Sequence, residues 1–84
     1  MIIFPTVHIG GTSQDALIDQ LTDTISAIDA VQRTLRVAAP NERDYYPQGP
    51  AAFKQASRDH QARVECLEAV QAELQELAEH IADQ

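Results

Sequence analysis

Two long stretches of the chain repeat apolar residues at steps of three and four, the spacing of an amphipathic helix. The first stretch begins after Gly10-Gly11, where Thr12 with Asp15 three positions later forms a T-x-x-D capping pattern. Proline disfavours helical geometry at the residue before it, so Pro40 should end this helix near Ala38. We therefore expect a helix over residues 12–38. Its apolar positions are Leu17 or Ile18, Leu21, Ile25, Ile28, Val31 and Leu35.

The second stretch predicts a helix over residues 51–83, entered through Gly49-Pro50 with proline in the first turn. A heptad-like seam covers almost its whole length, and one member of the seam, His60, is polar. The seam consists of Phe53, Ala56, His60, Val64, Leu67, Val70, Leu74, Leu77 and Ile81. With a loop over residues 39–50 between the helices, the pattern predicts one mainly α domain, an antiparallel two-helix hairpin with helices of roughly 40 to 50 Å.

Residues 1–11 differ from the rest, because MIIFPTVHI is rich in β-branched residues and reads as a strand. Nine residues with a proline cannot form a sheet alone. We expect an extended arm that either runs back along the hairpin or pairs with the same segment of another protomer.

A chain of 84 residues and 9.3 kDa buries only a modest core when it folds alone. The single cysteine, Cys66, excludes an intrachain disulfide, and no Cys/His cluster suggests a structural metal. We therefore expect a homo-oligomer that associates through helix packing.

Charge is distributed unevenly along the chain. All six basic residues lie between positions 33 and 63, and the net charge of this segment is +3. The rest of the chain has a net charge of −10, which gives the total of −7. Such a net charge argues against nucleic-acid binding, which depends on Lys and Arg neutralising phosphates. The fold predicted above would place the positive segment at one end of the molecule.

The segment RDYYPQGP in the predicted loop contains half of the chain's aromatic residues. A loop that only joins two helices does not need two tyrosines. One interpretation is structural, with the tyrosines covering the hairpin end. The other is a site in which a tyrosine stacks on a flat ligand while basic residues hold its anionic groups. The candidate ligand-binding residues are His8, Gly11, Thr12, Arg43, Asp44, Tyr45, Tyr46, Gln48, Lys54, Arg58, His60 and Arg63.

Two parts of this candidate site have structural alternatives. His60 lies one turn from Arg63 and could contact phosphate, or it could be a core histidine satisfied by another polar group. The turn from His8 through Thr12 could donate to a ligand, or serve only as a turn and cap. An antiparallel arrangement of protomers would bring this turn near the RDYYPQG segment of a neighbour.

Other classes of function have little support in the sequence. The histidines and Cys66 lack zinc-ligand spacing, so we expect no metal and no cofactor. No phosphate-binding loop, nucleophile elbow or pair of carboxylates in a cleft suggests an enzyme. The apolar stretch at the start of the chain is too short and too interrupted for a membrane span or signal peptide, and we expect a location in the cytoplasm.

The combination of HIGGTS, AAPNERDYYPQGPAAF and a second helix carrying H-x-x-R resembles a group of small uncharacterised proteins encoded by tailed bacteriophages and prophages. The resemblance covers most of the chain. This sequence departs from it at Gly10, where members more often have asparagine, and at Glu42, where they more often have glycine. The resemblance implies a phage or prophage origin and an accessory role such as countering host defence.

Three functions are consistent with these features. The first is sequestration of a small anionic ligand, such as a nucleotide immune signal, at the loop end. The second is a protein-interaction module whose acidic face, Glu65 to Asp83, or tyrosine-rich tip inhibits a host protein. The third is a small structural or assembly factor.

Overall fold

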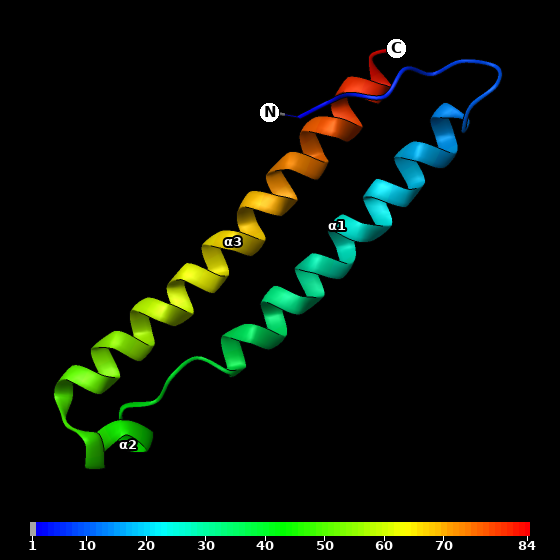
Figure 1. Cartoon of the computed structure of the whole chain (residues 1–84). Coiled ribbons are helices and arrows are strands. Elements are labelled where there is room, and N and C mark those ends of the chain that lie inside the picture. The colour runs from blue at the N-terminus through cyan, green and yellow to red at the C-terminus, as the bar shows by residue number, and fades with distance from the viewer. Residues whose placement is uncertain (1) are drawn as a thin grey trace.

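The computed structural model describes residues 2–84, which are mainly helical and contain no strand. The elements are α1 (Gln14–Val37), α2 (Glu42–Tyr45), the 3-10 turn η1 (Tyr46–Gln48) and α3 (Pro50–Ala82). α1 and α3 lie side by side and run in opposite directions, with α2 at one end of the pair and the C-terminus at the other (Figure 1). The molecule is a rod of 61 × 24 × 17 Å. No helix among the described residues is long and apolar enough to cross a membrane.

The mainly helical prediction is confirmed, but the cap of α1 lies one residue later than expected. Ser13, and not Thr12, is the N-cap, and its Oγ accepts a hydrogen bond from the Ala16 amide at 3.2 Å. Both side chains could cap, and the choice depends on which of them has the extended backbone that leads into the helix. At the other end Ala38 closes α1, two residues before Pro40.

The segment expected to be a loop over residues 39–50 contains the short helix α2 and the turn η1. Asn41 caps α2 through a hydrogen bond from the Arg43 amide to its Oδ1 at 3.1 Å. Gly49 then separates η1 from α3, which begins at Pro50. Short polar elements of this kind leave no periodic apolar signal, so the sequence pattern did not predict them.

The seams on the two long helices differ from the prediction at mid-length. Val31 and Val70 are 50% and 48% exposed, whereas their neighbours Gln32 and Gln71 are half-buried between the helices. Gln32 Nε2 donates to Gln71 Oε1 at 2.9 Å. Gln71 Nε2 donates to Asp29 Oδ1 at 2.7 Å and to the Ile25 carbonyl at 3.1 Å. Since this network satisfies the amides, glutamines replace the valines in the interhelical contact.

The Gln71 network yields a prediction about stability. Gln71→Ala removes every hydrogen bond that links this side chain to α1, so we expect it to lower the free energy of unfolding by about 1–2 kcal/mol. Gln75→Ala is the matched control, because the Gln75 side chain bonds only to Glu79 on its own helix. Urea unfolding measures both variants, and equal losses would contradict a role for Gln71 in joining the helices.

The N-terminal arm crosses the C-terminal end of α3, where the chain ends (Figure 1). Phe4 stacks on His80 with ring centroids 4.1 Å apart and an interplanar angle of 20°. The Gln84 side chain donates to the Pro5 carbonyl at 2.9 Å and accepts from the Val7 amide at 2.8 Å. The arm is therefore held by its own chain, and residues 2–13 form no strand.

Candidate functional site

A groove of about 390 Å³ lies where the turn formed by α2 and η1 meets the first turns of α3 and the end of α1. Four of the predicted site residues line it, namely Tyr45, Gln48, His60 and Arg63. The other lining residues are Ala38, Pro40, Ala52, Gln55, Ala56 and Asp59. Its volume falls within the usual range of small-molecule sites, about 300–1,000 Å³.

The α3 wall of the groove follows from helical spacing. Ala52, Ala56, Asp59 and Arg63 recur at steps of four, three and four, which places them on one face of the helix. The two alanines leave space, and the charged residues line the part further along the helix. His60 also lines the groove and is half-buried.

Tyr45, from α2, also lines the groove. Its ring is half-buried and packs against Phe53 at a centroid distance of 6.4 Å and an interplanar angle of 49°. The structural interpretation of this tyrosine therefore holds in part, since it covers the start of α3. It lines the groove at the same time, because an aromatic side chain can pack with one part and leave another accessible.

The charges in the groove are mixed. Arg63 is exposed and supplies a planar group suited to phosphate or carboxylate. The Asp59 carboxylate accepts from Gln55 Nε2 at 2.8 Å, while Gln55 Oε1 accepts from Arg58 Nη2 at 3.0 Å. Such a groove can bind an anionic group near Arg63 and a hydroxyl or amine donor near Asp59.

Tyr46 and Arg43 belong to the same turn but line a different hollow. Arg43 and Tyr46 line a shallow hollow of about 490 Å³ with Asn41 and Glu42, and Tyr46 is 81% exposed. Arg43 and Tyr46 thus line this hollow, whereas Gln48, His60 and Arg63 line the groove. Tyr45 and Tyr46 both line a third hollow.

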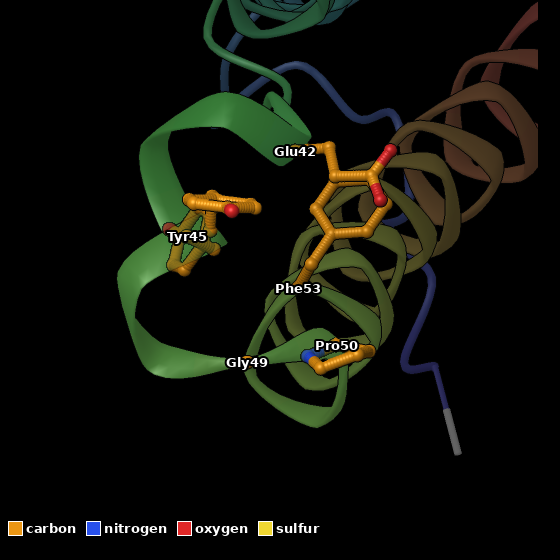
Figure 2. A pocket seen from close by; sticks show the side chains of 6 residues that line it. Glu42, Tyr45, Gly49, Pro50 and Phe53 are labelled. Atoms are coloured by element: carbon orange, nitrogen blue, oxygen red, sulfur yellow. The ribbon is translucent and has the colours of Figure 1, made fainter.

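A third hollow, of about 210 Å³, lies between α2 and the start of α3. Figure 2 shows Tyr45 and Phe53 on either side of it, with Gly49 and Pro50 at its base. The lining combines apolar and aromatic side chains with Glu42, a residue type that suits a cation or a neutral donor better than an anion.

Several predicted residues are not brought to these hollows. Asp44, Lys54 and Arg58 are exposed and line none of the three. The segment 8–12, which contains His8, Gly11 and Thr12, lies at the opposite end of the rod, just before α1 (Figure 1). Within one chain the two halves of the predicted site are therefore far apart.

The turn at His8 has a compact local structure. The Gly11 amide donates to the His8 carbonyl at 3.1 Å. A Cβ atom on Gly11 would lie 2.9 Å from His8 Nε2, so glycine at this position lets the imidazole lie over the turn. The ring is exposed, and a larger residue at position 11 would displace it.

Sequence reasoning missed Pro40, Gln55 and Asp59 as groove residues. The helical spacing from Ala52 to Arg63 was a usable signal for Asp59, because it shares a face with Arg63. For Pro40 the sequence predicts only the end of the first helix. Its place in the groove depends on the path of the chain after α1, which no local pattern encodes.

Within residues 2–84 no group of three or more His, Cys, Asp or Glu side chains is arranged to hold a metal ion. Comparisons with models of known protein families, with curated proteins and with solved structures gave no match for this chain. The site is therefore interpreted from its own geometry.

Proposed function

We propose that this chain is a phage or prophage accessory protein that binds and sequesters a small anionic ligand of the nucleotide class in the loop-end groove. The observation that carries the proposal is the groove itself, where Tyr45, His60 and Arg63 converge at the positive end of an otherwise acidic molecule. In this proposal the protein acts against host defence in the cytoplasm by holding a nucleotide signal, and it catalyses no reaction.

The chemistry of the groove suits a nucleotide. The guanidinium of Arg63 can form two parallel hydrogen bonds to a phosphate, and the His60 imidazole can add a third donor. The accessible part of Tyr45 offers an aromatic surface for a base, and Asp59 or Gln48 can accept from ribose or base donors. Each group has a distinct role, which favours a ligand with both an anionic and an aromatic part.

The proposal includes self-association of the two-helix hairpin through helix packing. Protomers that run antiparallel would bring the turn from His8 to Thr12 of one chain toward the groove of another. The glycines would allow close backbone approach, and Thr12 could donate its hydroxyl. This arrangement would use the exposed turn that a single chain leaves far from Arg63.

Thermal unfolding against a panel of cyclic di- and trinucleotides, ADP-ribose derivatives and plain nucleotides tests the proposal. A ligand at about 100 times its Kd stabilises the native state by about 2.7 kcal/mol. For a domain of this size we expect a rise in Tm of roughly 10–20 °C with one compound. Arg63→Ala should abolish that rise while leaving the unliganded Tm near its original value, because Arg63 is exposed.

Arg33→Ala is the control for this experiment. It removes an exposed arginine from α1 that lines none of the three hollows, so the ligand-dependent rise should persist. A panel that leaves Tm unchanged at saturating concentrations would contradict ligand sequestration. Loss of the rise in both variants would show a general charge effect and no specific contact in the groove.

A second candidate function is inhibition of a host protein through the acidic face of α3. The carboxylates Glu65, Glu68, Glu73, Glu76 and Glu79 are all exposed. This candidate predicts that reversing these charges abolishes capture of a basic host protein, while Arg63→Ala has no effect on it. The groove favours the first function, since an acidic exposed face also occurs in proteins that only need solubility.

A further inference from the structure

The single chain exposes more surface than a folded monomer of its mass. Its accessible surface is 6282 Å², whereas a compact monomeric protein of 9.3 kDa exposes about 5,000 Å². The excess is about 1,300 Å², and a protein interface of standard size covers about 800 Å² on each partner. Among residues 2–84 only Ile81 is fully buried. The excess surface is therefore large enough to form an interface.

A second heptad-spaced stripe on α1 lies beside the stripe that faces α3. It carries no charge, and its steps alternate between four and three along the helix. Its members are Gln20, Thr24, Ala27, Val31, Thr34 and Ala38. Each of these residues is exposed. Two adjacent stripes of this kind are typical of a helix that packs against two others in a bundle.

The C-terminal half of this stripe borders a fourth hollow. Ala30, Val31, Thr34, Leu35 and Ala38 line a mostly apolar hollow of about 410 Å³. Val31 is a half-exposed large side chain in its middle. Ala38 also lines the candidate ligand groove, so the two hollows adjoin at the loop end of the rod.

The distribution of charge along α1 favours a second copy of the chain, running antiparallel, as the partner that packs on this stripe. The first half of α1 carries Asp15, Asp19 and Asp23, and its last turns carry Arg33 and Arg36. A second copy running antiparallel places the basic last turns of one helix over the acidic first half of the other. A parallel copy would place like charges together along the whole rod, which is unfavourable at separations below the Debye length of about 8 Å.

We infer that the uncharged stripe on α1 is the face through which two copies of this chain pair, antiparallel and about a two-fold axis. In such a pair the same stripe serves both chains, because a two-fold interface is self-complementary. With the axis near position 29, Ala27 of one chain lies against Val31 of the other, and Thr24 lies against Thr34. The inference rests on the self-association included in the proposed function, and it assigns the surface.

Light scattering coupled to size-exclusion chromatography measures the mass of the assembly and tests whether the uncharged stripe on α1 is the pairing surface. The unaltered protein should have at least twice the mass of the 9.3 kDa chain, and Val31→Glu should reduce that mass, because pairing would bury two carboxylates without partners. Val37→Glu is the control, since Val37 is an exposed valine on α1 outside the stripe. Circular dichroism checks that both variants remain helical.

The possible results distinguish self-association itself from the assignment of the stripe as its surface. A monomer at every concentration would overturn self-association and the assigned surface together. An unaltered mass in Val31→Glu, with the original protein oligomeric, would overturn only the surface. If Val31→Glu loses its helices, Ala27→Glu provides the same test from an exposed alanine of the stripe.

Direction is tested by a spin label at Asp83→Cys in a Cys66→Ser background, where Cys66 is the only native thiol and is exposed. Antiparallel pairing places the two labels near opposite ends of a rod 61 Å long, so pulsed electron resonance should give a long distance. A dominant short distance would mean that the chains run parallel and would overturn the inferred geometry.

Discussion

Ile81→Ala should lower the free energy of unfolding by about 2–5 kcal/mol, the usual cost of truncating a buried isoleucine. Ile81 is 1% exposed. It lies where the end of α3 meets the start of α1, and its carbonyl accepts from Gln14 Nε2 at 2.8 Å. A small domain has a total stability of about 5–15 kcal/mol, so this loss would be a large fraction of the whole.

The control is Ile9→Ala, which makes the same chemical change at a residue that is 106% exposed. It should alter stability by no more than about 0.5 kcal/mol. Urea unfolding of the two variants, at one fixed protein concentration because the protein is proposed to self-associate, gives the comparison. Equal effects would mean that the junction around Ile81 contributes little to the folded state.

Gly49→Ala should cost about 1–3 kcal/mol through the backbone alone. Gly49 has φ 96° and ψ 167°, a conformation that is essentially restricted to glycine. A Cβ atom there would meet nothing within 4 Å, so the cost does not come from a clash. Since Gly49 joins η1 to α3, relief of the strain should also move Tyr45 and weaken ligand binding in the groove.

Gly10→Ala is the matched control for the backbone effect. Its φ lies outside the positive region, and its added Cβ would make only ordinary contact with the His8 ring at 3.5 Å. Its stability should be unchanged or slightly raised, because alanine reduces the freedom of the unfolded chain. Thermal unfolding distinguishes the two variants, and a similar loss in both would show that positive φ is not the cause.

The sequence predicted several residues of the candidate site, but it predicted their arrangement in space only in part. Tyr45, His60 and Arg63 were identified from residue type and spacing, and they share one groove. Arg43, predicted for the same site, lines a different hollow and belongs to the short helix α2. A four-residue helix is too short for a periodic signal, so its effect on direction could not be anticipated.

The sequence by itself determined the two long helices, the end of the first shortly before Pro40, the start of the second at Pro50, and the gathering of positive charge in residues 33–63. These features are local, because periodicity, proline geometry and charge depend on nearby residues alone. The tertiary structure decided which stripe faces the partner helix. It placed Gln32 and Gln71 inside and left Val31 and Val70 half-exposed, since the glutamines bond across the helices and apolar spacing alone cannot distinguish adjacent stripes.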